Sequence, residues 1–188
     1  MTLDAFSTLL VLGSIGLFAV LLVAWIGYAI SPKVRAHLLE HSYERYLVAI
    51  AVIGIASVVG TLVFQLAYET PVCELCWWQR IFLYPIAVIA PVALWYKTRE
   101  AHVTVAILSV FGLWYALYHY YYHFQRFVLG NTLTLPCSYG GLMPACTDSP
   151  ILIFGFATIP FLGIMVFGSF LMLAGLAHVA LRHAQRAL

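Results

Sequence analysis

Charged side chains are scarce in this chain. Asp, Glu, Lys and Arg make up 9% of its 188 residues, whereas hydrophobic residues make up 64%. A soluble globular domain carries about 25% charged residues, so the composition excludes an ordinary soluble domain. The net charge of +2 is too small, and the basic residues are too dispersed, to indicate a nucleic-acid partner. Most of the chain is therefore expected to lie in membrane lipid.

The sequence also lacks the alternating segments of about ten residues that are typical of a membrane β-barrel. Its apolar runs are continuous and reach the length of about 20 residues that a membrane-spanning helix needs. Five runs fit, at about residues 5–30, 44–67, 77–96, 103–124 and 151–178. The predicted fold is an all-α integral membrane protein, an antiparallel four-helix transmembrane bundle with one extra N-terminal transmembrane helix.

Basic residues are nearly absent from three of the exposed segments. The N-terminus and the segments 68–76 and 125–150 contain Arg126 as their one basic residue outside the predicted spans, whereas Lys and Arg gather in the other connections and at the C-terminus. The positive-inside rule then predicts an N-out, C-in topology with five spans. The first span has no basic residues before it and is too long for a signal peptide, so we expect it to be retained. We divide the chain into residues 1–43, an additional helix with a cytoplasmic linker, and residues 44–188, the bundle with its two extracytoplasmic loops.

The chain has only four cysteines, and this topology places all of them on the extracytoplasmic side. Cys73 and Cys76 form a Cys-x-x-Cys motif, and Cys137 and Cys146 lie in the long loop. Disulfides persist in such a compartment, so two structural disulfides are one interpretation. Redox exchange is the other, because a thiolate at a helix N-terminus is stabilised and Cys76 is expected at or just before one. Electrons could then pass between the two pairs through a mixed disulfide.

Arg80 follows Cys76 by four residues, so its side chain shares a helix face with the sulfur. A charge at that depth in a membrane is costly and usually functional. Its positive charge favours a thiolate at Cys76. The alternative is that Arg80 extends to the membrane surface or pairs with Glu69 or Glu74.

Other cofactor chemistries fit the sequence less well. Zinc is disfavoured by the Cys-x8-Cys spacing of the loop pair, and covalent haem by Trp77 at the position where a histidine is required. His119 and His123 are four residues apart, which suits a metal or cofactor pocket or else a polar stripe at the membrane surface. A b-type haem or metal carrier using these two or His102 is disfavoured, since no histidine pair on two different spans is evident.

Three motifs resemble one family. They are Cys73-Glu-Leu-Cys76-Trp-Trp-Gln-Arg80-Ile-Phe-Leu-Tyr84-Pro85, Pro136-Cys137 with Cys146, and Gly155-Phe-Ala-Thr-Ile-Pro160-Phe. Together, over about residues 44–178, they resemble the DsbB family of quinone-linked disulfide-forming membrane oxidases, and are most similar to its shorter-looped BdbC-type branch. The resemblance implies a four-helix bundle with a ubiquinone or menaquinone beside the Cys-x-x-Cys motif, in a bacterial plasma membrane.

The resemblance also implies roles for the site residues. Cys137 is the sulfur attacked by a reduced DsbA-like thioredoxin-fold partner, Cys146 then attacks Cys73, and Cys76 becomes the thiolate that faces the quinone. Arg80 matches the family arginine beside the quinone, and His119 is similar in place to a family histidine. The vitamin K epoxide reductase homologues use the same parts in another order, and Cys73 preceding Cys137 favours the DsbB order.

The sequence therefore predicts a membrane thiol:disulfide oxidoreductase that reoxidises a DsbA-like partner and passes the electrons to a membrane quinone, with no metal. A non-catalytic membrane protein with structural disulfides and a vitamin K epoxide reductase-like quinone reductase remain the alternatives.

Overall fold

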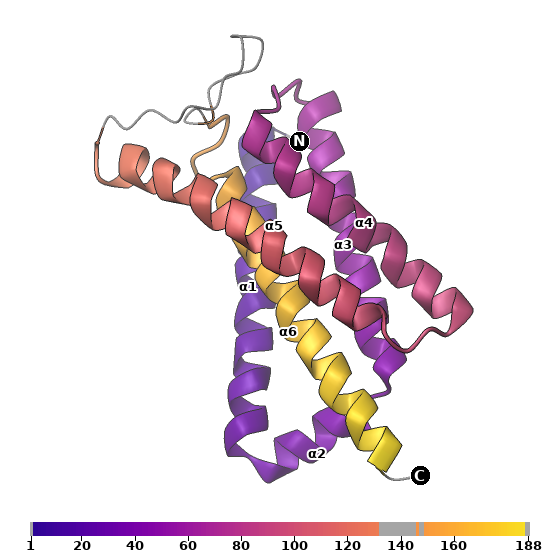
Figure 1. Ribbon diagram of the computed structural model, residues 1–188. Helices are drawn as coiled ribbons and strands as arrows, with labels where there is room; N and C mark the ends of the chain where they lie inside the picture. Colours follow the sequence, from indigo (N-terminus) through magenta and orange to yellow (C-terminus); the bar gives the residue numbers. More distant parts are fainter. Residues whose placement is uncertain (1, 132–145, 147–148, 187–188) are drawn as a thin grey trace.

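A computed structural model describes residues 2–131, 146 and 149–186, so Cys137 lies outside the described part of the chain. Its elements are helical (Figure 1). They are α1 (Leu3–Ile30), α2 (Pro32–Glu40), α3 (Tyr43–Leu66), α4 (Glu74–Tyr96), α5 (Ala101–His123), its π-helical continuation η1 (Phe124–Val128) and α6 (Ile159–Arg186). Between η1 and α6, the structure describes one isolated β-bridge, from Ile153 to Ala157, and no strand within the ranges given above.

Five of these helices are long and apolar enough to cross a membrane, which confirms the predicted all-α architecture. The last span begins and ends later in the chain than predicted, since α6 covers Ile159–Arg186 and not residues 151–178. Residues 151–158 were expected to be helical, but Phe154 and Gly155 have positive φ values of 54° and 77° and close a tight turn inside the bridge. Pro160 therefore stands in the first turn of α6, where a missing N–H costs nothing.

Local capping explains how α1 ends and α2 begins. Ser31 has an extended conformation, and its Oγ accepts a hydrogen bond from the Val34 N–H at 3.4 Å. Pro32 follows as the first residue of α2, where its fixed φ suits a helix start. The short α2 then leads the chain from α1 back to the bundle (Figure 1).

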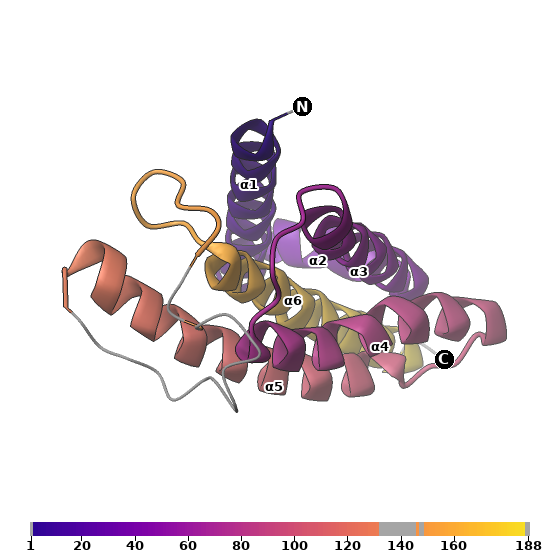
Figure 2. The same ribbon diagram turned by 90° about the horizontal axis from the view of Figure 1, so that it is seen from above.

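The bundle is a closed ring of four helices. Helices α3 and α4, α4 and α5, α5 and α6, and α6 and α3 pack on one another, and α1 packs on the outside of α6 (Figure 2). Ile50, Ile86, Val105 and Phe170, one from each helix of the ring, are fully buried. The ring therefore surrounds a hydrophobic core, to which α1 adds Leu21 from outside the ring.

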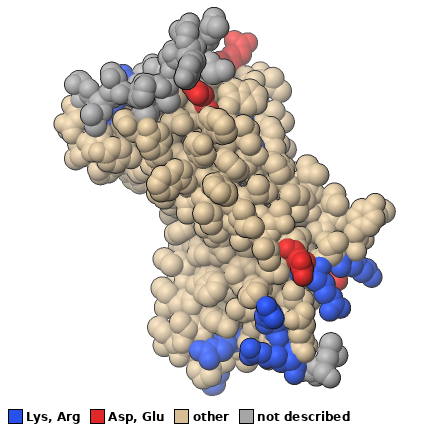
Figure 3. All heavy atoms as spheres, in the orientation of Figure 1, with Lys and Arg blue, Asp and Glu red and all other residues tan. Residues whose placement is uncertain are grey.

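The two ends of the molecule differ in charge. Figure 3 shows Lys and Arg gathered at the end that carries α2 and the C-terminus. The opposite end carries the start of α4, the end of α5 and the segment that leads into α6 (Figure 1). The cysteine motif therefore lies at the end remote from this basic cluster.

Candidate redox site

Cys73 stands directly before α4 and caps it. Its Sγ accepts a hydrogen bond from the Cys76 backbone N–H at 3.3 Å, in the way that a Ser or Asp side chain caps a helix. Cys76 was expected at or just before the helix start, but the helix begins at Glu74, so Cys76 lies within its first turn. The sulfur that faces the free N–H groups is therefore that of Cys73.

Both cysteines of the motif are free thiols, and Cys73 is almost completely buried, with 4% of its surface exposed. The pKa of Cys73 is lowered to about 5, chiefly because the Cys76 thiol donates a hydrogen bond to it. Burial opposes this effect, and His119 adds to it. In the reduced motif Cys73 is thus the thiolate, whereas Cys76 was expected to be the thiolate because of Arg80.

Two histidines of α5 hold Cys146. The Nε2 atoms of His119 and His123 lie 2.9 and 2.8 Å from the carbonyl oxygen of Cys146. Because a carbonyl only accepts hydrogen bonds, both rings donate through Nε2–H. Both side chains are buried, so they are not a polar stripe at the membrane surface. We call His119 and His123 the two-histidine clamp.

The clamp places Cys146 next to the Cys-x-x-Cys motif. Cys73, Leu75 and Cys146 form one buried cluster, against which Cys76 packs. His119 links the two segments, since its Nε2 also lies 4.0 Å from the Cys73 Sγ. Cys146 is disulfide-bonded, and because Cys73 and Cys76 are both free, neither of them is its partner.

Gln79 orients His119 of the clamp, and it was not among the site residues expected from the sequence. Since His119 donates through Nε2, its Nδ1 accepts the hydrogen bond from the Gln79 amide at 3.2 Å. A Cβ at Gly163 of α6 would lie 2.5 Å from the Gln79 Oε1, so a glycine there gives this amide its room. The signal in the sequence was the position of Gln79, one helical turn after Cys76.

Arg80 is buried in the protein and does not extend to the surface, with 7% of its area exposed. Its guanidinium donates to the side-chain oxygen of Gln65 and, at 3.2 Å, to the backbone oxygen of Thr61. It also lies 5.2 Å from the centre of the Trp77 ring. Both hydrogen-bond acceptors are neutral, and neither is a glutamate as the alternative interpretation would require, so the positive charge of Arg80 remains available.

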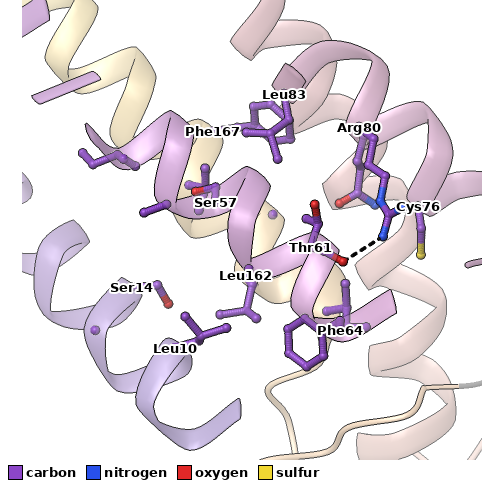
Figure 4. A pocket seen from close by; sticks show the side chains of 18 of the residues that line it. Leu10, Ser14, Ser57, Thr61, Phe64, Cys76, Arg80, Leu83, Leu162 and Phe167 are labelled. Atoms are coloured by element: carbon purple, nitrogen blue, oxygen red, sulfur yellow. Dashed lines mark hydrogen bonds between the residues drawn. The ribbon is translucent and has the colours of Figure 1, made fainter. Parts of the chain in front are cut away.

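A cavity of about 340 Å³ adjoins Arg80. Its walls come from α1, α3, α4, α6 and residues 70–72, and they are mostly apolar (Figure 4). Cys76, Gln79 and Arg80 contribute to the wall from α4, and among the described lining residues Arg80 is the one that carries a charge. His119 was expected to bind a cofactor, but it lies behind Gln79, against the cysteines, and is not among the residues that line the cavity.

Two further histidine arrangements bear on metal and haem chemistry. The ligand atoms of Cys73, Cys76 and His119 lie within 4.8 Å of one another. This group differs from the set of four cysteines that was weighed as a zinc site from the sequence. His102 of α5 and His178 of α6 are also paired, with Nε2 and Nδ1 3.0 Å apart. The expectation that no histidines pair across two spans was therefore wrong, but these nitrogens bond to each other and are too close for a haem iron between them.

Comparison with known proteins identifies the family of this chain. The family model for disulfide bond formation protein DsbB matches residues 43–177, well over half of the chain. The chain belongs to the DsbB family. It is accordingly a multi-pass membrane protein of disulfide formation and a disulfide-forming oxidoreductase. No solved structure matches the chain.

Several relatives in this family carry matching names. Disulfide bond formation protein C of Bacillus subtilis is 32% identical over 65% of this chain and 84% of its own length. A probable disulfide formation protein of Coxiella burnetii (strain CbuK_Q154) is 34% identical over 60% of this chain and 73% of its own. A probable disulfide formation protein C 1 of Bacillus cereus is 37% identical over 57% and 73%. The resemblance to the BdbC-type branch is thus confirmed, and the family match begins at the first residue of α3, which leaves α1 and α2 outside it.

Proposed function

We propose that this protein reoxidises a DsbA-like thiol oxidase and passes the electrons through its two cysteine pairs to a membrane quinone. One observation carries the proposal. Cys146 packs against Cys73 in a buried cluster, while Cys76, the other half of the motif, lines the cavity that contains Arg80. The motif thus contacts the loop cysteine on one side and an apolar cavity on the other.

The exchange steps balance in atoms and electrons. A thiolate of the reduced partner attacks the loop disulfide at Cys137 and releases Cys146 as a thiolate. Cys146 attacks the sulfur of Cys73 in the oxidised motif, which breaks the Cys73–Cys76 bond and releases Cys76. The second partner thiol then resolves its mixed disulfide and frees Cys137, which attacks Cys146 and releases Cys73. The partner leaves oxidised, the loop disulfide is restored, and the motif holds two electrons and two protons.

The redox state of the described cysteines corresponds to one point in this cycle. Cys146 is in a disulfide while Cys73 and Cys76 are thiols. This is the state that follows oxidation of the partner and precedes transfer to the quinone. The low pKa of Cys73 suits it to leave as a thiolate when Cys137 recovers Cys146.

The cavity fits a lipid-soluble quinone. Its walls are mostly apolar, and Cys76 and Arg80 lie in them. When bound, ubiquinone or menaquinone supplies the acceptor for two electrons. Arg80 uses two of its N–H groups on Gln65 and Thr61, so others remain for a quinone oxygen, whose developing negative charge they would stabilise. Cys76 holds the thiol nearest to that acceptor, because Cys73 is turned toward the clamp.

The orientation in the membrane belongs to the same proposal. The basic residues at the end with α2 and the C-terminus support an N-out, C-in topology in a bacterial plasma membrane (Figure 3). The cysteine motif and Cys146 then lie on the extracytoplasmic side. Residues 44–188 form the redox unit, and residues 1–43 are an addition to it.

The test is a Cys76→Ser variant assayed with a reduced DsbA-like protein and a quinone. We expect quinone reduction to be abolished, while the partner still forms a mixed disulfide with the loop cysteines. Quinone reduction at the wild-type rate would refute the relay. Loop cysteines in the wild type that do not react with the reduced partner would instead favour a protein with structural disulfides.

A further inference from the structure

Helix α1 is attached to the bundle through α6. The Trp25 Nε1 donates a hydrogen bond to the Met172 oxygen at 3.0 Å, and the Trp25 ring covers Gly175, where a Cβ would come within 2.7 Å of it. Phe18 covers Gly168 in the same way, also at 2.7 Å. These contacts need glycines in α6 and use the middle and C-terminal half of α1. They hold α1 in one position although it lies outside the family match.

The N-terminal half of α1 approaches α3. Phe6 packs edge-on against Phe64, with ring centres 5.2 Å apart, and Leu10 reaches the site of Gly60. Leu10, Gly60 and Phe64 also line the cavity, which continues from these contacts along α1 and α3. Figure 4 shows Leu10 and Ser14 of α1 on one side of the cavity and Arg80 and Cys76 of α4 on the other.

The cavity is longer than the redox site needs. On α3 its lining runs from Phe64, beside the motif, to Val52, which is about 18 Å along a helix. The part remote from Arg80 is lined by aliphatic and aromatic side chains, with Leu17 on α1 and Phe167 on α6. Ser14 does not make the α1 wall polar, since its hydroxyl donates to the Val11 oxygen at 2.9 Å. The remote part therefore suits a hydrocarbon chain continuous with a polar head at Arg80.

We propose that α1 completes the quinone site by forming the outer wall of a channel for the isoprenoid tail. This inference rests on the proposed function and goes beyond it, because it assigns to the helix outside the family match a role in selecting the tail of the substrate. The ring binds at Arg80 and Cys76, which belong to the family core, and the tail lies between α1 and α3. Affinity for the tail then depends on α1, whereas chemistry at the ring does not.

Two glycines of α1 provide a matched test. Gly13 lines the cavity, and a Cβ there meets nothing within 4 Å. Gly16 has equally open space but is not among the cavity-lining residues. Gly13→Phe introduces a ring at the channel wall from a position where a Cβ meets no neighbour, and Gly16→Phe adds the same ring to the same helix outside the cavity lining.

We expect Gly13→Phe to raise the KM for quinones with long isoprenoid tails by at least about tenfold. The KM for a tail-less benzoquinone and the rate of exchange with the thiol partner should not change, and Gly16→Phe should behave as wild type with both quinones. An unchanged KM for the long-tailed quinone in Gly13→Phe, or an equal rise for both quinones, would overturn the proposal.

A second measurement does not depend on activity. Quinone is extracted from each purified protein and quantified by chromatography. Wild type and Gly16→Phe should retain quinone, and Gly13→Phe should lose it. Retention in all three proteins, or phospholipid in place of quinone in the wild type, overturns the α1 channel while the relay stands. A wild-type protein that neither retains nor reduces quinone refutes the proposed function and the channel together.

Discussion

Helix α5 carries buried histidines at both ends, and the two ends use them differently. At one end His119 and His123 both donate to the backbone of Cys146, the loop cysteine of the proposed relay. At the other end His102 bonds to His178 of α6, and the ring of Tyr43 packs edge-on against it. The first pair holds a loop through two donors from one helix, while the second joins two helices to each other. Burial of a histidine pair therefore does not by itself indicate a functional role. The segment that the pair contacts does.

Removing both histidines of the clamp should have the strongest effect on electron transfer. The double variant His119→Ala, His123→Ala should slow electron transfer from the loop pair to Cys73 by about 100-fold, because the Cys146 segment loses both of its donors. Rapid alkylation and mass spectrometry of the cysteine peptides would follow the transfer. His123→Gln keeps an N–H donor and should restore part of the rate in an otherwise wild-type clamp.

The matched control lies at the opposite end of α5. His178→Ala removes the partner of His102 and should cost about 1–3 kcal/mol of stability, because a buried ring nitrogen is left unsatisfied. Its cysteine exchange rate should be that of wild type. An equal loss of exchange in His178→Ala and in the clamp variant would mean that both pairs act only through stability.

A substitution at Arg80 should affect quinone binding at the cavity without affecting cysteine exchange at the clamp, and its effect should be smaller. Arg80→Gln removes the charge that would face a quinone oxygen and should raise the KM for quinone by about tenfold. The thermal unfolding temperature should decrease only slightly. Exchange between the loop pair and Cys73 should be unchanged, since the clamp does not contact Arg80. Unchanged quinone kinetics would show that Arg80 serves only to tie α4 to Gln65 and Thr61.

The smallest effect concerns pH. Thiolate absorbance of Cys73 in the reduced protein should persist at neutral pH and disappear as the pH falls through about 5. Because this pKa is lower than that of an unfolded cysteine, its contribution to the stability of the reduced protein is complete above the unfolded pKa and is lost progressively as the pH falls from there through about 5. Cys76→Ala removes the main hydrogen-bond donor and should raise the pKa of Cys73, and His119→Ala should raise it less.

A pH titration of the His178→Ala variant gives the reference for this comparison. It should reproduce the wild-type midpoint, because His178 lies at the other end of the bundle. A wild-type midpoint in Cys76→Ala would show that another group stabilises the Cys73 thiolate.

The order of residues along the chain was enough to predict the class of fold, and it singled out the candidate redox residues. Five long apolar runs predict five helices, because lipid offers no hydrogen-bond partners to free backbone groups. The spacing of the Cys-x-x-Cys motif and Arg80 is a local feature of the sequence. The four-residue spacing of His119 and His123 likewise showed that they share a helix face.

Only the tertiary structure decided what those residues contact. Capping of α4 by Cys73 reversed the expected position of the thiolate, and Gln79, Gly163 and the His102–His178 pair depend on packing between helices that are distant in sequence. The cavity wall supplied by α1 depends in the same way on where aromatic rings meet glycines of α6. Hydropathy and local spacing do not predict which helix faces contact each other, because those contacts depend on how side-chain shapes fit when the helices pack.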